Sequence, residues 1–370
     1  MPLLRERKNT PIAAAGPLGE EPGEDPVLVS VPMRSVRQTI FHVRAAASGV
    51  RAEARESCGF AKNALTGGGP ARQDGATAER QEAWPRIALV TPVRNGAAYI
   101  EQTMRSVLGQ NYPNLEYVVV DGGSTDGTRE IIRKYEGQLT GWISEPDQGM
   151  YDALNKGFAR TSGEIMGWLN AGDLLHVNGL MVVGGVFGTL PQVDWLTGRP
   201  TKFSEGGETI EVMDLPRWSR FRFLAGANKY IQQESTFWRR SLWDRAGGKV
   251  EARLRAEGDF ELWVRFFRYA KLYSVDALIG GYRLHTNALG GGDPKRYDKM
   301  CDEIVREELQ ATKGALGTKL FVRATRMIQG VPKVRGGWNR VAVRALYQWA
   351  GADWPPVIRY DVEKGWVCVK

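Results

Sequence analysis

The chain has 370 residues, of which 42% are hydrophobic and three are cysteines. This length is enough to bury a sizeable core, and the cysteines are too far apart in sequence for the short spacing of a zinc site. Residues 179–190 are the longest nearly uncharged apolar stretch and are too few to cross a bilayer, which takes about 20 apolar residues. Because the first residues also lack the apolar run of a signal peptide, we expect a cytoplasmic protein.

The net charge of +8 comes from the end of the chain. Residues 313–370 carry 11 basic and 3 acidic side chains, whereas 1–85 carry 11 and 10 and 86–312 carry 28 and 29. Apolar residues between these basic ones suit an anionic membrane surface, which predicts peripheral attachment to the inner face of the membrane. A solvated helix pair packed on the core is the open alternative. We expect no nucleic-acid partner, because no recognition motif accompanies the charge.

Composition divides the chain into three parts. Residues 1–85 are rich in Gly, Pro and Ala, which predicts a low-complexity, disordered extension. Within it, 31–55 have the spacing of a basic amphipathic helix, and a solvated helix without a role is the alternative. We predict a folded domain at 86–312, with halves at 86–175 and 176–312, and a basic helical tail at 313–370 that could end in a hairpin.

Strands and helices alternate four times in the first half of the predicted domain. Apolar runs predict strands at 87–91, 115–121, 139–144 and 165–169, and helical spacing follows each of the first three. Alternation at such short spacing is typical of βαβ units on a parallel sheet with right-handed crossovers. We therefore expect an α/β fold with a mostly parallel central sheet.

The regular alternation stops after residue 173. The remaining patterns predict a helix at 178–187, a strand at 193–198, a hairpin turning at 205–207, a helix at 259–269, two short strands ending at His285 and an amphipathic helix at 297–309. We expect these elements to complete the same domain.

Polar and small residues follow all four predicted strands, at 91–95, 121–126, 145–149 and 170–173. Because the carboxyl ends of parallel strands share one edge of a sheet, these side chains would gather there. Carboxylates, hydroxyls and amides together suit a ligand with ribose hydroxyls and phosphates that needs a divalent cation. Each of these groups alone is also typical of a turn or helix cap. The chain has neither GxGxxG after the first strand nor GxxxxGK[ST], so a dinucleotide cradle and a P-loop are not supported.

Seven motifs occur along the chain in a recognisable order: TPVRN, VVVDGGSTDGT, SEPDQGMYDALNKG and IMGWLNAGD, followed by QQESTFWRR, EGDFELWVR and GGYRLH. Together they resemble the family 2 glycosyltransferases, over roughly residues 86–290. The resemblance implies the GT-A fold, a Rossmann-like fold with a mostly parallel central sheet, here followed by an α-helical tail. It also implies a nucleotide-sugar donor in the half at 86–175 and an acceptor in the half at 176–312.

The resemblance assigns roles to individual residues. Those that would bind the nucleotide sugar are Thr91, Pro92, Asn95, Asp121, Ser124, Asp126, Asp147, Asn155, Asn170 and Asp173, and those on the acceptor side are Gln233 and Glu234. Asp173 and His285 would hold Mn²⁺ or Mg²⁺, although His285 is equally explained as a packed or surface residue. The family usually has an acidic pair where this chain has Gly172 and Asp173, so one carboxylate is missing.

Asp259, in EGDFELW, matches the catalytic base of the inverting members of the family. The resemblance implies that it takes the proton of the acceptor hydroxyl, which attacks the anomeric carbon. A metal ion would stabilise the charge on the leaving nucleoside diphosphate. Without the resemblance, Asp259 is also a good helix N-cap ahead of Phe260.

The sequence therefore predicts a non-processive glycosyltransferase of the kind used in bacterial polysaccharide and glycan biosynthesis. It would move one sugar from a nucleoside-diphosphate sugar, by preference a UDP-sugar, to a hydroxyl of a glycan or lipid-linked acceptor, with inversion. A sugar nucleotidyltransferase is an alternative, but its glycine-rich, lysine-bearing loop is absent after 87–91. A non-catalytic glycan- or nucleotide-binding scaffold is a second alternative, which Gly172 makes conceivable.

Overall fold

The computed structural model describes residues 84–226, 229–285, 294–311 and 354–369, together with 319, 320, 322–324 and 327. The helix predicted at 31–55 and most of the basic tail lie outside these residues, and the three-part division of the chain stays a prediction. Within the described part of the chain, none of the helices has the length and apolar character that a bilayer crossing requires.

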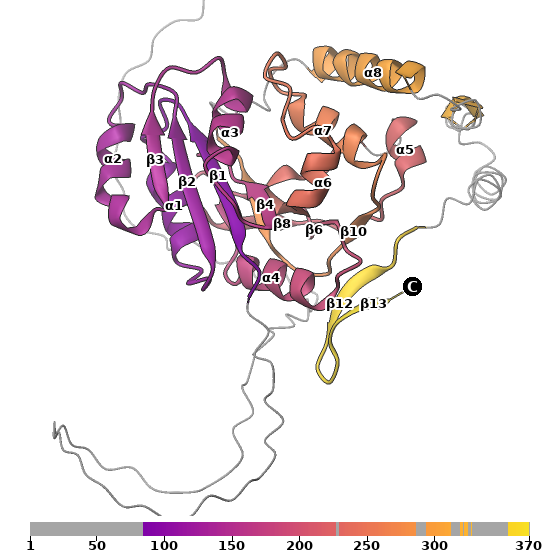
Figure 1. The fold of residues 1–370 in the computed structure, drawn as a ribbon, viewed down its shortest axis with the longest axis horizontal. Helices are drawn as coiled ribbons and strands as arrows, with labels where there is room; N and C mark the ends of the chain where they lie inside the picture. The colour runs from indigo at the N-terminus through magenta and orange to yellow at the C-terminus, as the bar shows by residue number, and fades with distance from the viewer. Residues whose placement is uncertain are drawn as a thin grey trace, which may run out of the picture. The chain divides into compact units, whose positions relative to one another are not determined.

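A seven-stranded sheet forms the centre of the fold, in the order β10-β6-β9-β4-β1-β2-β3 (Figure 1). Its strands are β1 (Ile87–Val93), β2 (Leu115–Asp121), β3 (Gly141–Ser144), β4 (Ile165–Trp168), β6 (Trp195–Thr197), β9 (Thr236–Arg239) and β10 (Leu272–Ser274). The first four are parallel to one another, whereas β9 is antiparallel to both β4 and β6. The predicted α/β fold with a mostly parallel sheet is confirmed.

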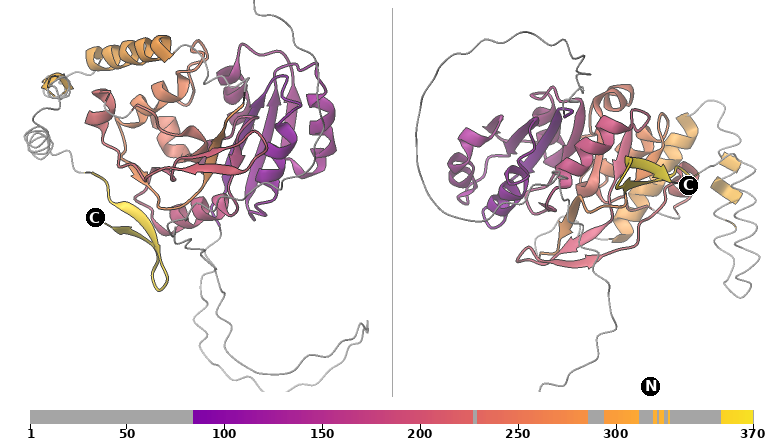
Figure 2. Two further views of the ribbon diagram at one scale, coloured as in Figure 1. Left: turned by 180° about the vertical axis from the view of Figure 1, so that it is seen from behind. Right: turned by 90° about the horizontal axis from the view of Figure 1, so that it is seen from below.

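Helices cover both faces of this sheet (Figure 2). One face packs against α1 (Ile100–Leu108), α2 (Thr128–Lys134) and α4 (Gly179–Thr189), and the other against α3 (Met150–Phe158) and α7 (Gly258–Phe266). Along β1, Leu89 joins the first core and Val90 the second, because successive side chains of a strand point to opposite faces. Burial on both faces explains why these strands are apolar without alternation.

Two smaller sheets complete the described part. One has the order β5-β11-β7-β8 and the other is the antiparallel pair β12-β13. The remaining strands and helices of the described residues are η1 (Glu136–Gln138), β5 (Leu174–Leu175), β7 (Thr201–Phe203), β8 (Thr209–Val212), α5 (Arg220–Leu224), η2 (Gln233–Ser235), α6 (Arg240–Arg245), β11 (Gly280–Arg283), α8 (Pro294–Ala311), β12 (Val357–Asp361) and β13 (Gly365–Val369).

A cluster of tryptophans fixes α7 against the end of β4. The indole rings of Trp168 and Trp263 are stacked, with centroids 5.9 Å apart and an interplanar angle of 8°. Trp238 on β9 meets the edge of both, at 5.5 Å from Trp168 and 5.6 Å from Trp263. Aromatic pairs at such separations contribute about 0.5–1.5 kcal/mol beyond the burial of their surface. This packing places the start of α7 near the carboxyl end of β4.

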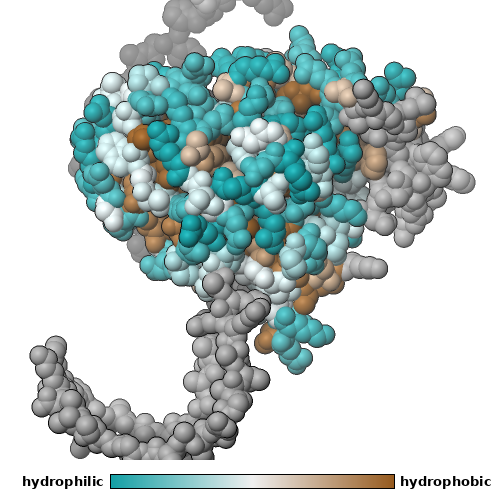
Figure 3. All heavy atoms as spheres, in the orientation of Figure 1, coloured by the Kyte–Doolittle hydropathy of each residue, from teal (hydrophilic) through white to brown (hydrophobic). Residues whose placement is uncertain are grey.

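The surface on the side shown in Figure 3 is largely hydrophilic, with apolar residues scattered among polar ones. Strand β8 is exposed along its whole length and includes Ile210 and Val212. Single exposed apolar side chains of this kind are normal on soluble proteins.

Candidate active site

The loops that follow β1 and β2 are joined by hydrogen bonds. The backbone N–H of Asn95 donates to Ser124 Oγ at 2.7 Å, and Asn95 Oδ1 accepts from the N–H of Thr125 at 3.0 Å. Asn95 has a φ of 51°, in the left-handed region that asparagine tolerates. The predicted gathering of polar residues at the carboxyl edge of the sheet is therefore present for these two loops.

Asp121 is fully buried at the end of β2, and its carboxylate is hydrogen-bonded to neighbouring residues of the protein. It accepts hydrogen bonds from the hydroxyl and the N–H of Ser124 and from Ser144 Oγ, the last at 2.6 Å. Asp147 is close by, because a Cβ built on Gly122 would lie 2.2 Å from its Oδ2. The structure thus brings Asp121, Ser124 and Asp147 together, and their contact with a nucleotide stays a prediction.

Asp126 organises the loop between β2 and α2. Its carboxylate accepts from the N–H groups of Ala97 and Thr128, at 3.0 and 3.1 Å. Burial raises the pKa of Asp126, but the hydrogen bonds from Thr128 and Ala97 outweigh it, so the pKa lies below its ordinary value. The N-cap of α2 is Gly127, not the residues at 124–126 whose side chains suit a cap.

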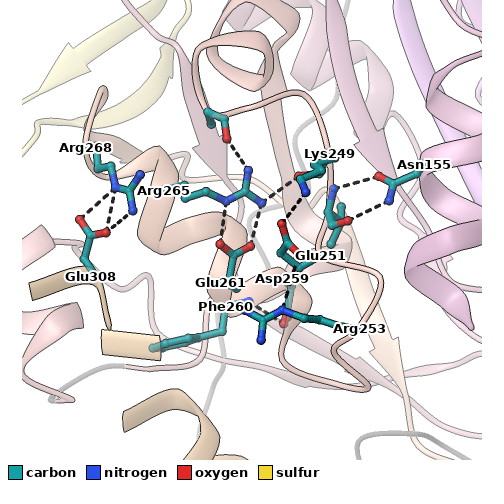
Figure 4. Close-up of polar contacts among 12 residues, drawn as sticks. Asn155, Lys249, Glu251, Arg253, Asp259, Phe260, Glu261, Arg265, Arg268 and Glu308 are labelled. Atoms are coloured by element: carbon teal, nitrogen blue, oxygen red, sulfur yellow. Dashed lines mark hydrogen bonds and ion pairs between the residues drawn. The ribbon is translucent and has the colours of Figure 1, made fainter. Parts of the chain in front are cut away.

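Three predicted donor-site residues lie inside the fold. The hydroxyls of Thr91 and Tyr117 are 3.0 Å apart and buried, and Pro92 is buried beside them on β1. The amide of Asn155 binds the backbone of Val250 in both directions, at 2.8 and 2.9 Å (Figure 4). These contacts give Thr91 and Asn155 a structural role, and a direct contact with the donor stays a prediction for all three.

Asp173 lies at the centre of the site, 3% exposed, in the turn after β4. Its Oδ1 accepts from the backbone N–H of Arg283 at 3.0 Å, and its Oδ2 accepts from the amide of Asn170 at 3.1 Å. Burial raises the pKa of Asp173 to about 6, against the opposing effect of these hydrogen bonds. The group is ionised at neutral pH but binds a proton more readily than an exposed aspartate.

Glu234 faces Asp173, and their carboxyl groups are hydrogen-bonded to each other. Burial and then the charge of Asp173 raise the pKa of Glu234 well above its ordinary value. The raised pKa favours the protonated form of Glu234, which can donate a hydrogen bond to Asp173. Gln233 fixes the same corner, because its Nε2 donates to the carbonyl of Trp168 at 2.6 Å and its Oε1 accepts from Asn170 at 3.3 Å.

His285 fills the space that a side chain at position 172 would occupy. A Cβ built on Gly172 would lie 2.7 Å from His285 Nε2. The imidazole packs on Tyr99 with ring centroids 4.7 Å apart, and burial followed by the charge of Arg283 lowers the pKa of His285. Position 172, where the family usually has an acidic residue, is glycine in this chain, and the imidazole of His285 occupies the space that a side chain there would need.

Asp259 is the second residue of α7 and is partly buried. The structure does not support an N-cap role, because the helix begins at Gly258 with Glu257 as its N-cap. Asp259 Oδ1 accepts the N–H of Phe260 at 2.7 Å (Figure 4). Burial raises the pKa of Asp259 to about 7 against this hydrogen bond. A carboxylate with such a pKa exchanges protons near neutral pH, as a general base must.

Tyr151, a residue without a role in the sequence-based interpretation, anchors the start of α7. It is buried on α3, and the backbone N–H groups of Gly258 and Asp259 donate to its hydroxyl. Gly258 permits this approach, because a Cβ there would lie 2.6 Å from the tyrosine ring. The signal in the sequence was the tyrosine inside SEPDQGMYDALNKG, but its partner lies over 100 residues away.

The groups that could bind a cation are Asp173, Asn170 and His285. Asn170 Oδ1 and His285 Nδ1 are buried and have no hydrogen-bond partner within the described ranges. No group of three or more His, Cys, Asp and Glu residues in the described part of the chain is close enough to hold a metal ion. This donor set fits a cation that takes most of its ligands from phosphates and water, as Mg²⁺ commonly does.

Comparison with known proteins decides the family. Residues 88–244 match the family described as Glycosyl transferase family 2. A putative teichuronic acid biosynthesis glycosyltransferase of Bacillus subtilis, TuaG, is 37% identical over 259 residues, which cover 65% of this chain and 94% of the relative. The chain belongs to glycosyltransferase family 2. It is thus an enzyme that uses a nucleotide-sugar donor.

Other members of the family and a solved structure agree with this assignment. An uncharacterized glycosyltransferase of Rickettsia prowazekii is 25% identical over 243 residues, covering 62% of this chain and 76% of the relative. The crystal structure of S. aureus TarS residues 1–349 superimposes with a TM-score of 0.54 at 16% identity, covering 72% of this chain and 79% of that one. At this identity the likeness concerns the fold, and it supports the GT-A architecture of this glycosyltransferase.

Replacing Gly172 by alanine in this glycosyltransferase is expected to lower kcat/KM for the donor by roughly 10- to 100-fold, because the new methyl group must displace His285 from Tyr99. In a His285→Ala background the same substitution should cost much less, because the space is then free. Steady-state kinetics of the two single variants and the double variant measure this coupling. An equal loss in both backgrounds would contradict the steric explanation.

Proposed function

We propose that this glycosyltransferase transfers one sugar from a UDP-sugar to a hydroxyl of a glycan or lipid-linked acceptor, with inversion at the anomeric carbon. The observation that carries the proposal is the position of two carboxyl groups in the site, Asp259 at the start of α7 and Asp173 in the turn after β4. Burial raises the pKa of Asp259 to about 7 and that of Asp173 to about 6. Carboxyl groups with raised pKa values are typical of functional sites.

Asp259 is the proposed general base. Its carboxylate takes the proton of the acceptor hydroxyl, whose oxygen forms a bond to the anomeric carbon of the donor sugar. The bond between that carbon and the diphosphate oxygen breaks, and the nucleoside diphosphate leaves with the electron pair. The hydrogen bonds to Tyr151 and Phe260 support this role, because they fix the start of α7 and so the direction of the carboxylate.

Asp173 and Asn170, with His285 beside them, are proposed to hold Mn²⁺ or Mg²⁺ together with the donor. Such an ion supplies positive charge next to the diphosphate, which lowers the cost of the charge that develops on the leaving group. The carboxyl group of Glu234 is hydrogen-bonded to Asp173 and orients it, and the backbone N–H of Arg283 binds Oδ1 of Asp173. One carboxylate with phosphate and water ligands is a common arrangement for Mg²⁺.

The donor and the setting are supported by relatives and by the charge of the chain. TarS, which shares the fold, has been crystallised with UDP-GlcNAc and with UDP, and TuaG is named for teichuronic acid biosynthesis. By similarity to these two proteins, we propose that this chain uses a UDP-sugar as donor and an acceptor of bacterial glycan biosynthesis. The 11 basic and 3 acidic side chains of 313–370 support a peripheral position on the inner face of the membrane, beside a lipid-linked acceptor.

A donor screen with the full-length chain tests this function. UDP-, GDP- and dTDP-sugars are incubated with Mn²⁺, with Mg²⁺ or with EDTA, and release of the nucleoside diphosphate is followed. We expect slow hydrolysis of a UDP-sugar that depends on the cation, and an inverted anomer by NMR. Turnover of GDP- or dTDP-sugars alone would contradict the UDP donor. Pyrophosphate release from a nucleoside triphosphate and a sugar phosphate would instead indicate a nucleotidyltransferase.

A further inference from the structure

Arg283, at the end of β11, lies in the middle of the site and is fully buried. Its backbone N–H binds Asp173, and its Cζ lies 5.1 Å from the centroid of the Tyr99 ring. The Tyr99 ring in turn packs against His285, with an interplanar angle of 40°. The guanidinium group is therefore next to the loop after β1 and close to the turn after β4, where the diphosphate of the donor is proposed to bind.

The guanidinium of Arg283 uses only one of its three nitrogens within the described residues. Nη1 donates to the backbone oxygen of Glu205 at 3.2 Å, whereas Nε and Nη2 are buried and have no hydrogen-bond partner in the described part of the chain. A buried donor without an acceptor is unfavourable, even where opposite charges lie nearby. Buried N–H groups are nearly always satisfied in a working protein, so these two require an acceptor.

The two unpartnered nitrogens form one edge of the guanidinium plane. Elsewhere in this protein the same edge binds a carboxylate (Figure 4). Arg265 donates from Nε and Nη2 to the two oxygens of Glu261, at 2.8 and 2.7 Å. Arg268 donates from the same two nitrogens to Glu308, with Nε at 2.8 Å from Oε2. This edge matches a pair of oxygens on a carboxylate or phosphate.

We propose that Arg283 is an oxyanion-binding residue of the donor site, whose Nε and Nη2 hold two oxygens of the donor substrate. The inference rests on the proposed nucleotide-sugar donor. Two groups of such a donor offer the required pair of oxygens, namely the outer phosphate and a carboxylate on a uronic acid sugar. Their chemistry toward arginine is the same, and nucleotides of increasing length distinguish them.

The arriving oxyanion must displace part of the present surroundings, because both nitrogens are buried. Glu205 lies in the exposed turn between β7 and β8 and accepts the hydroxyl of Tyr99 at 2.6 Å. Its backbone oxygen also accepts from Arg283 Nη1, so this turn is hydrogen-bonded once to the guanidinium and once to Tyr99. We expect this turn to shift when the donor binds.

The test compares Arg283→Lys, Arg283→Met and the matched control Arg268→Met in the full-length protein. Lysine keeps the charge but loses the two-pronged edge, and methionine keeps the stem without the charge. Binding of uridine, UMP, UDP, UDP-glucose and UDP-glucuronic acid is measured by calorimetry, and thermal unfolding is followed in parallel. Arg268 serves as the control because its edge already binds Glu308, away from the donor site.

If Arg283 binds the outer phosphate, both Arg283 variants should bind UDP at least about tenfold more weakly, with uridine and UMP unchanged. If it binds a sugar carboxylate, UDP binding should be unchanged and the preference for UDP-glucuronic acid over UDP-glucose should disappear. Either result supports the inference. Arg283→Met should remain folded with a cooperative unfolding transition, because methionine keeps the apolar stem of the side chain. Arg268→Met should lower the Tm and leave every affinity unchanged.

The inference is overturned if the Arg283 variants bind all five probes as the wild type does. It is also overturned if both variants fail to fold, because the guanidinium would then have a structural role. A wild-type protein that binds none of the probes would instead overturn the proposed UDP donor on which the inference rests.

Discussion

Asp259→Asn is expected to reduce sugar transfer by about 10²- to 10⁴-fold, the usual contribution of a general base. The donor affinity should not change, because the proposed base acts on the acceptor. Asparagine can still accept the N–H of Phe260, so the start of α7 should keep its conformation. Initial rates at saturating donor measure the loss of transfer, and calorimetry measures the donor affinity separately. Transfer at the wild-type rate would refute the role of Asp259.

The wild-type rate should rise with pH through about 7, because only the ionised form of Asp259 can accept a proton. This limb should be absent from Asp259→Asn. Glu257→Gln is a matched control on the preceding turn, since the charge of Glu257 contributes to the raised pKa of Asp259. It should move the rise to lower pH and keep the plateau rate. If the residual rate of Asp259→Asn still rose with pH through about 7, the titrating group would be a residue other than Asp259.

Asp259→Asn should also change the free energy of unfolding, by an amount that depends on pH. Asp259 keeps its proton up to about pH 7 in the folded protein, whereas an unfolded aspartate loses it near pH 4. The free energy of unfolding of the wild type therefore falls as pH rises between these values. Asp259→Asn has no such group, so its stability relative to the wild type should increase over the same interval. Thermal unfolding at about pH 5 and about pH 8 measures the difference.

Asp173→Asn is expected to reduce donor turnover by about 10²- to 10³-fold, because the carboxylate proposed to hold the cation beside the leaving diphosphate is lost. The amide oxygen can still accept the N–H of Arg283, so the turn after β4 should be preserved. The variant should also require more Mn²⁺ than the wild type for half-maximal rate. Rates measured across a range of cation concentrations provide this comparison.

Glu234→Gln is the matched control for Asp173→Asn. Burial and the charge of Asp173 raise the pKa of Glu234 and so favour its protonated form, and glutamine imitates this neutral form and its hydrogen bond to Asp173. Its effect on turnover should be clearly smaller than that of Asp173→Asn. Equal losses in the two variants would mean that Glu234 acts as a carboxylate, and full activity of Asp173→Asn would remove Asp173 from the mechanism.

The sequence by itself determined the α/β architecture and the edge of the sheet that carries the polar loops. These features depend on local patterns: apolar runs predict buried strands, and helical spacing between them predicts crossovers. The motif order was enough to identify the family and to single out Asp173 and Asp259. Local patterns did not give the position of Asp259 in its helix. They suit an N-cap, whereas α7 begins one residue earlier, at Gly258.

Only the tertiary structure decided how residues from distant segments combine. Glu234 is 61 residues from Asp173 in sequence, yet their carboxyl groups are hydrogen-bonded to each other and burial raises the pKa of both. His285 occupies the space beside Gly172, and two buried nitrogens of Arg283 have no hydrogen-bond partner among the described residues. Burial, close packing and hydrogen-bond satisfaction depend on three-dimensional neighbours. These properties, which set the pKa values and the proposed oxyanion contact, could not be obtained from the spacing of residues in the sequence.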